Sequence, residues 1–458
     1  MTIDEKKSHL ILKDNNIYKG LLVLSLPLML NNLLKSLHGI VDMIFVSDLG
    51  DGAISSISLT WSMIFIFLSF SFGVGAAGTA IISQYLGANN KKMAKKTSGQ
   101  LLIIAITLSV LFNVILYIMA PFLLRISGAQ GFVYENAVKY LRIRSFEMLP
   151  VFVFTVYTSV RQAGGDTVTP VILNTVAVII NIALSGLFIK VLGFGVPGAG
   201  IATIISNYLV FPVSIYYLFI SKSGVTITLS DLKLDFRVIG ELLKIAIPSS
   251  FANAVTSVGF MIMNAIIIRE FGAVTLDAFG VGNRINALTL LPIMSISTVL
   301  STYIGQNVGA QNSTRAKLVF KKATSFTLFV AVLGIIVVMP FRGVIISAFL
   351  KNQDSLELCK TYLFYLTLTL PFFGIFQLLL GVFRGLGHVK YILILSLSRL
   401  WLFRLPMITI MIYILNFKES GLWHAMWISN IIAVILGYYL YNRTKFVPRI
   451  RVEDGSIS

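Results

Sequence analysis

The sequence predicts an all-α integral membrane protein whose twelve transmembrane helices form two six-helix bundles. Three observations support this fold class: the composition, a series of twelve apolar runs, and an internal repeat. The 458 residues are 56% hydrophobic and 12% charged, with a mean hydropathy of +0.86. Soluble domains carry roughly 25% charged residues, so most of this surface must face lipid.

Twelve apolar runs follow one another with short connections, and each has the ~20 residues that a membrane-spanning helix needs. They fall at 18–47, 53–82, 98–122, 134–158, 168–190, 198–220, 241–268, 276–302, 320–348, 355–380, 389–415 and 420–442. The more polar stretch 221–240 separates the sixth run from the seventh. We therefore expect an N-terminal lobe at 18–220 and a C-terminal lobe at 241–442, with a linker at 221–240 and tails at 1–17 and 443–458.

An internal repeat relates the two halves, because four segments recur in order at shifts of 221 to 223 residues. The matching pairs are Pro27 with Pro248, Gln84–Asn89 with Gln306–Gln311, Arg161–Gly164 with Arg384–Gly387, and Ser206–Asn207 with Ser429–Asn430. An even number of helices per half gives both halves the same orientation in the membrane. The sequence therefore predicts a pseudo-twofold axis along the membrane normal.

The distribution of basic residues predicts the orientation of the chain. Most of the 37 lysines and arginines lie in the even-numbered connections and in the two tails, which the positive-inside rule places in the cytoplasm. The first 17 residues lack the apolar core and cleavage site of a secretory signal, so the first span should start insertion. We expect a multi-pass protein of the plasma or inner membrane with both termini in the cytoplasm.

Several function classes are disfavoured. The net charge of +18 does not indicate nucleic-acid binding, because the basic residues lie in short clusters between apolar runs. The single cysteine, Cys359, excludes an internal disulfide, and no P-loop, zinc-ligand spacing or Gly-x-Ser-x-Gly elbow indicates catalysis. Two bundles that rock around a shared cavity are typical of secondary transporters. We expect a small amphipathic substrate, contact with lipid, no cofactor and a monomer.

Asp42 is the clearest carboxylate inside a predicted span. A buried carboxylate costs about 3 kcal/mol on insertion scales, so such a residue is a functional candidate, although Asp42 could also be an interfacial acid. Asn181, Ser185 and Thr203 should lie at a similar depth on the fifth and sixth spans. Carboxylate, amide and hydroxyl oxygens suit a proton network or Na⁺, with Asp42, Asn181 and Thr203 as the ligands of a sodium ion.

Cationic side chains also fall inside predicted spans. Lys35 and His38 precede Asp42 at seven and four residues, so the three should share one helix face that lines the cavity. Arg284, Arg399 and Arg404, in the second half, either bind backbone carbonyls and pack the bundle or line the cavity. In the second case they would favour anionic, zwitterionic or large amphipathic cargo.

These motifs resemble the multidrug and toxic compound extrusion (MATE) family of the multidrug/oligosaccharidyl-lipid/polysaccharide export superfamily. The resemblance covers nearly the whole chain. It rests on Pro27, Val41–Val46, Leu49–Gly50, Gln84–Asn89, Arg161–Thr167, Val196–Ala202 and Gly305–Ala310. It implies an inner-membrane antiporter that exports drugs or metabolites in exchange for H⁺ or Na⁺.

The resemblance also implies residue roles. Asp42 matches the first-span acid whose protonation or Na⁺ binding is linked to extrusion, and Pro27 matches a proline where bending has been proposed. Tyr140, Asn181 and Thr203 match polar members of the N-terminal cation site. Ser185 stands where some relatives carry a second acid, and the tenth span has no interior acid. We therefore expect coupling through the first half alone, as in the DinF-like branch, with protons favoured over sodium.

Three other functions stay open at this point. A flippase for lipid-linked precursors belongs to the same superfamily, and buried cations would suit a pyrophosphate-bearing cargo. A membrane-embedded acyltransferase would need a catalytic histidine at cavity depth, for which His424 is a poor candidate. The duplicated, cavity-forming arrangement argues against a passive channel.

Overall fold

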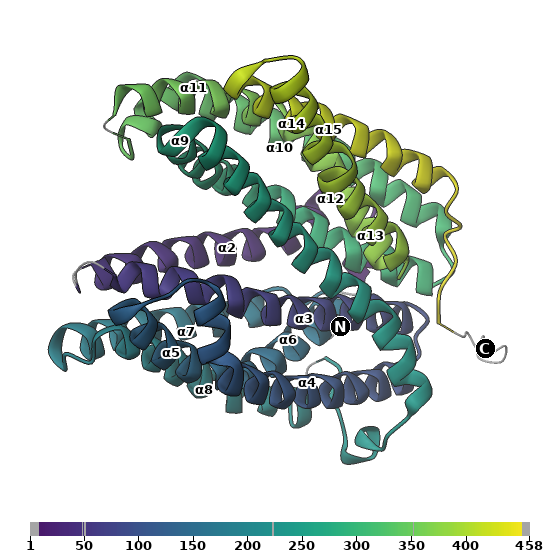
Figure 1. The fold of residues 1–458 in the computed structure, drawn as a ribbon. Helices are drawn as coiled ribbons and strands as arrows, with labels where there is room; N and C mark the ends of the chain where they lie inside the picture. The colour runs from purple at the N-terminus through teal and green to yellow at the C-terminus, as the bar shows by residue number, and fades with distance from the viewer. Residues whose placement is uncertain (1–8, 48, 50–51, 222–223, 351, 451–458) are drawn as a thin grey trace. The chain divides into compact units, whose positions relative to one another are not determined.

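The computed structural model describes residues 9–47, 49, 52–221, 224–350 and 352–450 (Figure 1). The side chains of Ile40, Asp42, Met43, Ser47 and Ile54 lie outside this description. In the described part every regular element is helical. The elements of the first half are α2 (Ile17–Ser47), α3 (Ala53–Gly87), α4 (Lys91–Ile126), α5 (Gly131–Ser145), α6 (Met148–Ala163), α7 (Val168–Gly186), η1 (Leu187–Val191) and α8 (Gly195–Phe219).

The second half repeats this succession after a short helix, η2 (Leu229–Leu232). Its elements are α9 (Phe236–Gly309), α10 (Ser313–Ser347), α11 (Gln353–Leu368), α12 (Leu370–Gly385), α13 (Val389–Leu397), η3 (Ser398–Arg404), α14 (Leu405–Thr409), η4 (Ile410–Ile414) and α15 (Lys418–Asn442). Helix α9 begins at Phe236, within the stretch that the sequence predicts as linker.

The described helices are consistent with the twelve spans that the sequence predicts. Helix α9 is 74 residues long and contains two of them, because Gly272 breaks it with φ 80° and ψ −173°. Glycine adopts such a conformation without steric penalty. Helices α11 and α12 together make one span, bent by 50° at their junction.

The fourth span is also broken, which the apolar run at 134–158 does not reveal. Helix α5 ends at Ser145 and α6 begins at Met148, so the two helices extend the span to 131–163. Helix α5 carries Lys139, Arg142 and Arg144 and is less apolar than α6. An apolar run reports the mean hydropathy of a segment, so it does not show the break at residues 146–147.

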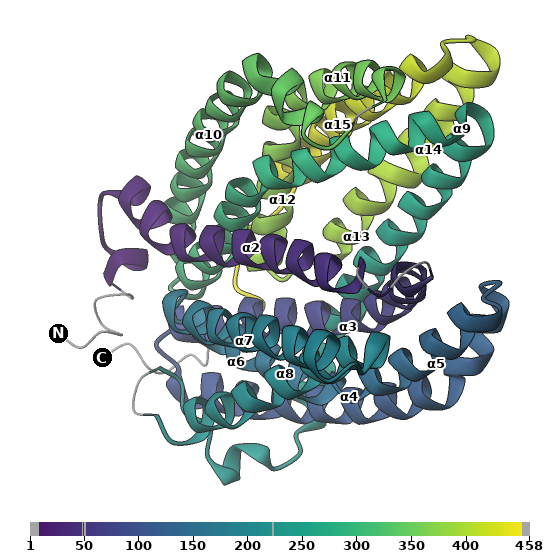
Figure 2. The same cartoon turned by 90° about the vertical axis from the view of Figure 1, so that its left-hand side faces the viewer.

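The internal repeat is visible in how helices pack within each lobe. In the first lobe α4 packs against α5 and α6, and α8 packs against α5, α6 and α7. In the second lobe α10 packs against α11 and α12, and α15 packs against α11, α12 and η3. Figure 2 shows the two sets, α4 to α8 in blue and α10 to α15 in green to yellow. Each lobe thus buries its apolar faces in the same order.

Chain contacts divide the protein into two compact units, and two of the divisions, after Leu26 and after Ser250, lie inside helices. The described residues 9–13 and Pro27–Ser250 belong to the first unit, whereas Asp14–Leu26 and the described chain from Phe251 onward belong to the second. The first turns of α2 are held in the second unit by α10: the Arg315 Nη2 atom donates to the Asp14 carbonyl at 2.6 Å, and the Tyr18 ring meets Phe326 edge-on at 6.4 Å. Helix α2 therefore changes unit at Pro27.

The start of α9 is held in the first unit in the corresponding way. A Cβ atom at Gly73 of α3 would lie 2.1 Å from the Ser250 hydroxyl and 2.4 Å from the Ala246 carbonyl oxygen. Only glycine allows this close approach of two helix backbones. Pro248, the repeat partner of Pro27, lies in this segment.

The linker between the halves is fastened to α4. The Gln100 carboxamide donates to the carbonyls of Asp231 at 2.7 Å and Lys233 at 2.9 Å, and its oxygen accepts from the Asp235 N–H at 3.0 Å. The Lys96 ammonium pairs with the Asp235 carboxylate. The hydrogen bond from Lys96 is the largest reason why the pKa of Asp235 is below its usual value. Polar contacts therefore hold linker residues 229–235, called the strap below, against α4.

Candidate functional site

Helices α2 and α7 run parallel and are joined by two polar contacts. The Asn174 Nδ2 atom donates to Asn31 Oδ1 at 2.7 Å, and two turns further on His38 Nε2 lies 2.6 Å from Asn181 Oδ1. Both pairs are separated by 143 residues, so the two helices keep one register over this length. The first and fifth spans are both odd-numbered, so they cross the membrane in the same direction. Parallel packing of α2 and α7 agrees with this order of spans.

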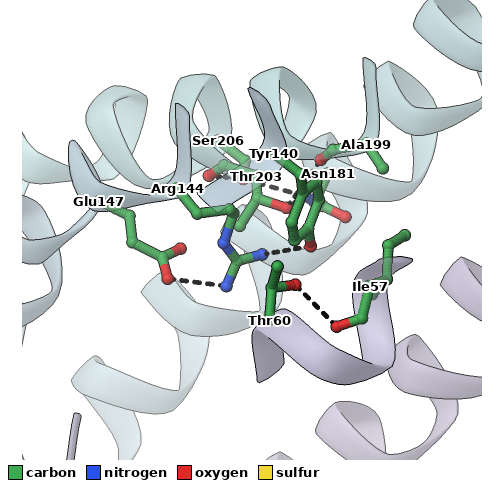
Figure 3. Close-up of polar contacts among 9 residues, drawn as sticks. All are labelled: Ile57, Thr60, Tyr140, Arg144, Glu147, Asn181, Ala199, Thr203 and Ser206. Carbon is green, nitrogen blue, oxygen red and sulfur yellow. Dashed lines mark hydrogen bonds and ion pairs between the residues drawn. The ribbon is translucent and has the colours of Figure 1, made fainter. Parts of the chain in front are cut away.

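Asn181 is the centre of the polar network in the first lobe. Its side chain is only 2% exposed. The Nδ2 atom donates to Thr203 Oγ1 at 3.2 Å and to Ser206 Oγ at 3.4 Å, both on α8. The Ser185 hydroxyl donates back to Asn181 Oδ1 at 3.4 Å. One carboxamide therefore connects α2, α7 and α8, as Figure 3 shows for the α7 and α8 side chains.

The hydrogen-bond directions in this network follow from its hydroxyl groups. Thr203 donates its own hydroxyl hydrogen to the Ala199 carbonyl at 3.0 Å, and Ser206 donates to the Thr203 carbonyl at 2.9 Å. Their oxygens are therefore left to accept from the Asn181 NH₂ group, which turns Oδ1 toward His38. A carboxamide oxygen only accepts, so the imidazole must carry a hydrogen on Nε2.

Tyr140 packs beside this network and belongs to a buried ionic group. A Cβ atom at Gly200 of α8 would lie 3.3 Å from the Tyr140 ring, one turn before Thr203. Arg144 donates to the Tyr140 hydroxyl at 3.4 Å and to Glu147 Oε1 at 2.7 Å (Figure 3). The side chains of Arg144 and Glu147 are 10% and 2% exposed. The break between α5 and α6 thus contains a buried ion pair next to the candidate site.

The remaining first-lobe candidates all lie on α2. Pro27 is inside the helix, at the point where the chain changes unit. Lys35 is exposed, whereas His38, one turn later, is half-buried against α7. Asp42 is part of α2, one further turn from His38, but its side chain lies outside the described residues. The structure therefore brings His38, Asn181, Ser185 and Thr203 into one network.

The two arginine candidates of the second half have different surroundings. Arg284 on α9 is exposed. Arg399 on η3 is 7% exposed, and its guanidinium lies over the rings of Phe376 at 4.8 Å and Phe373 at 5.5 Å. Arg399 also donates to Asn430 Oδ1 at 3.4 Å.

Sequence reasoning missed several participants. Ser206 entered only as a repeat marker, yet it accepts directly from Asn181. Its recurrence as Ser429 was a signal of a polar role in both lobes. The Asn31–Asn174 pair gave no signal beyond a polar residue in each span, and the link from His38 to Asn181 needed the register of α2 against α7.

Comparisons with known proteins agree with this architecture. The family model MatE matches residues 27–187 and 248–410, one block in each half. The probable multidrug resistance protein YoeA of Bacillus subtilis (strain 168) is 26% identical over 436 residues, which cover 93% of this chain and 94% of that protein. The FAD transporter of Shewanella oneidensis is 27% identical over 432 residues, which cover 93% and 95% of the two chains.

Solved structures support the fold. An outward-facing multidrug resistance MATE family transporter of the MOP superfamily matches with a TM-score of 0.90 at 24% identity, over 96% of this chain and 97% of that chain. At this identity the match shows the fold alone. Because the family model covers more than half of the chain and lies in both lobes, this protein belongs to the MatE family of multidrug efflux transporters and is not an enzyme.

Proposed function

We propose that this protein is an antiporter that exports amphipathic small molecules in exchange for protons, with coupling through Asp42 and the Asn181 network of the first lobe. The observation that carries the proposal is the 2.6 Å contact between His38 of α2 and Asn181 of α7. It ties the helix that bears Asp42 to the buried polar centre of the lobe. A proton added near this contact changes the hydrogen bonds that hold α2 against α7.

The state of the oxygens favours protons over sodium. Na⁺ requires several oxygen atoms with free lone pairs. In this network the Asn181 oxygen already accepts from His38 and Ser185, and the Thr203 oxygen accepts from the Asn181 amide. Removing these hydrogen bonds to coordinate sodium would leave buried donors unpaired, which costs about 1–3 kcal/mol for each group. Protonation of a carboxylate requires no such rearrangement of these oxygens.

The membrane part of the proposal rests on the fold and the family. Helices long and apolar enough to cross a membrane run through both lobes. The relatives are named for multidrug resistance and for FAD transport, and these names support a small-molecule cargo. We propose cytoplasmic termini, because the basic connections and tails would then lie on the cytoplasmic side. No resident cofactor is proposed, since the coupling ion is itself transported.

Reconstitution tests this function. Purified protein in liposomes is loaded with a fluorescent amphipathic dye, and efflux is started by a pH gradient or by a Na⁺ gradient. We expect the pH gradient to drive efflux and the Na⁺ gradient to have no effect. Asp42→Asn should lose gradient-driven efflux, because an amide cannot exchange a proton in this range. Asp277→Asn, which removes an exposed carboxylate of α9, should behave as wild type.

Either of two results would contradict the proposal. Efflux driven by sodium at constant pH would assign the coupling to a different ion. Undiminished pH-driven efflux by Asp42→Asn would remove Asp42 from the mechanism.

A further inference from the structure

The second lobe buries two arginine side chains that share one neutral acceptor. Arg399 is 7% exposed and Arg404 is 2% exposed. Arg404 Nη2 donates to Asn430 Oδ1 at 3.0 Å, and Arg399 Nη1 donates to the same oxygen at 3.4 Å. Arg404 Nε donates to the Ser429 hydroxyl at 3.0 Å. Among the described residues no carboxylate pairs with either guanidinium.

The backbone of η3 is what brings the two side chains together. Residues five apart in an α-helix point about 140° away from each other, at 3.6 residues per turn. Residues Ser398–Arg404 form a π-helix instead, and its wider turn aligns residue i with residue i+5. Such π-segments are frequent at functional sites. Here the segment turns Arg399 and Arg404 toward the same point on α15.

The internal repeat shows that this cluster is the counterpart of the first-lobe network. The shift of 223 residues that relates Ser206 to Ser429 also relates Asn181 to Arg404. In the first lobe Asn181 donates to Ser206, and in the second Arg404 donates to Ser429. The aromatic neighbour is kept as well, since Tyr140 corresponds to Tyr362 at a shift of 222.

The charge at this place is reversed between the lobes. The shift of 221 that relates Pro27 to Pro248 takes Asp42 to Met263. Met263 is fully buried in an apolar cluster with Tyr362 and Trp423. In the second lobe an apolar side chain, Met263, therefore stands where the first lobe has Asp42, and Arg404 stands where the first lobe has Asn181. A site arranged for a cation in one lobe has the charge for an anion in the other.

We propose that Arg399, Arg404 and Asn430 form a binding site for the carboxylate or phosphate group of an aromatic cargo molecule. A buried charge without a counter-charge is unfavourable, and a bound oxyanion would neutralise it. The Nε atom of Arg399 is buried without a hydrogen-bond partner, so a donor is free for the ligand. Guanidinium groups bind carboxylates and phosphates through two parallel hydrogen bonds.

Aromatic side chains next to the arginines favour a ligand with a ring system. Arg399 lies over Phe373 and Phe376, and the Tyr362 ring stacks on Trp423 with centroids 4.2 Å apart. Rings of this kind pack against flat apolar surfaces. The release of such a cargo across the membrane rests on the proposed transport function, whereas its binding does not.

Two dyes with one ring system and opposite charge test the site. Fluorescein is an anionic xanthene and rhodamine 6G is a cationic one, and their binding to full-length protein in detergent is followed by fluorescence anisotropy. Arg399→Gln should weaken fluorescein binding by at least about tenfold, as expected when a charge-assisted hydrogen bond is lost. Rhodamine 6G affinity should change by less than about twofold. Arg399→Lys keeps the charge and loses the paired donors of the guanidinium group, so it should weaken fluorescein binding less than Arg399→Gln does.

Arg342→Gln is the matched control. This arginine of α10 also lies over an aromatic ring, Phe364 at 5.6 Å, and donates to the Met339 carbonyl at 3.5 Å. Its replacement should leave the binding of both dyes unchanged. Equal fluorescein affinity in wild type, Arg399→Gln and Arg399→Lys would overturn the proposal, as would the absence of fluorescein binding to wild type.

A membrane lipid could supply the same phosphate chemistry, so the binding is repeated in nanodiscs. Discs of phosphatidylcholine are compared with discs that contain phosphatidylglycerol. Equal fluorescein affinity in both supports a cargo site. Displacement of the dye by phosphatidylglycerol, lost in Arg399→Gln, would assign the cluster to lipid and overturn the cargo assignment. Failure of the antiport function would appear separately, as an absence of gradient-driven efflux with dye binding intact.

Discussion

At the scale of single residues, the two lobes stabilise buried charge by different means. The first lobe pairs Arg144 with Glu147 at the break between α5 and α6. Among the described residues of the second lobe, the partners of Arg399 and Arg404 are an amide, a hydroxyl and ring faces. Buried ion pairs are sensitive to loss of one partner, because the remaining charge stays in a medium of low polarity.

Arg144→Met should therefore destabilise the protein by about 3–5 kcal/mol, since Glu147 would be left buried and unpaired. Thermal unfolding in detergent measures the effect. The double variant Arg144→Met, Glu147→Met should regain most of the lost stability. Lys360→Met is the control: Lys360 pairs with Glu357 at the same spacing and at 2.7 Å, but both side chains are partly or largely exposed, so the change should be below about 1 kcal/mol. Equal destabilisation by the two single variants would refute this account.

Part of the candidate site could be predicted at this scale. Depth in the membrane placed Asn181 and Thr203 near each other, because topology and span boundaries alone fix depth. The partners of His38 and the direction of the Asn181 amide could not be predicted, because they depend on the rotation of α2 against α7. Arg404 looked like another buried cation in the sequence, and only the π-helix and its contact with Asn430 relate it to Arg399.

At the scale of elements, the twelve spans could be predicted while their irregularities could not. Apolar runs report where lipid surrounds a helix, and the helices themselves continue further: α4 begins at Lys91 although its apolar run begins near residue 98. Breaks such as Gly272 and π-segments such as η3 leave hydropathy unchanged. They follow from local backbone geometry, and only a glycine gives a hint of their position.

The strap on α4 gives a pH-dependent prediction. The pKa of Asp235 is lowered from 3.8, first by the hydrogen bond from Lys96 and then by the Val238 N–H, so the folded strap favours the ionised carboxylate. The contact between Lys96 and Asp235 is fully present above the ordinary pKa of 3.8, and it is lost as the pH falls through the lowered pKa of Asp235. A spin label at Ser230→Cys should become mobile at that point.

Lys96→Met should move this transition to higher pH, because the largest cause of the shift is removed. Lys92→Met, which changes an exposed lysine one turn earlier on α4, should leave the transition in place. An identical midpoint in Lys96→Met and wild type would show that the ion pair does not hold the strap.

At the scale of the whole molecule, the duplicated architecture was predictable because the repeat markers keep one shift along the chain. The start of α2, before Pro27, belongs to the second unit, and the start of α9, up to Ser250, belongs to the first. This arrangement was not predictable, because it depends on which neighbours the first turns contact. The reversal of charge between the two polar centres becomes visible only when the repeat is combined with the observed contacts.

The proposed orientation predicts which positions an impermeant maleimide can reach in intact cells. Ser127→Cys, exposed after α4, should be labelled from outside. Ser230→Cys, exposed in the strap, should be labelled only after the membrane is opened. The native Cys359 is fully buried and should react slowly in both cases. The opposite labelling pattern would invert the topology.

Substrate-induced proton release tests the central claim most directly. Protein in weakly buffered detergent solution is mixed with an amphipathic dye, and a pH indicator records the protons released while dye binding is measured in parallel. Wild type should release protons on binding, whereas Asp42→Asn should bind the dye and release none, and Asn181→Leu should release fewer. Proton release by Asp42→Asn equal to that of wild type would contradict coupling through the first lobe.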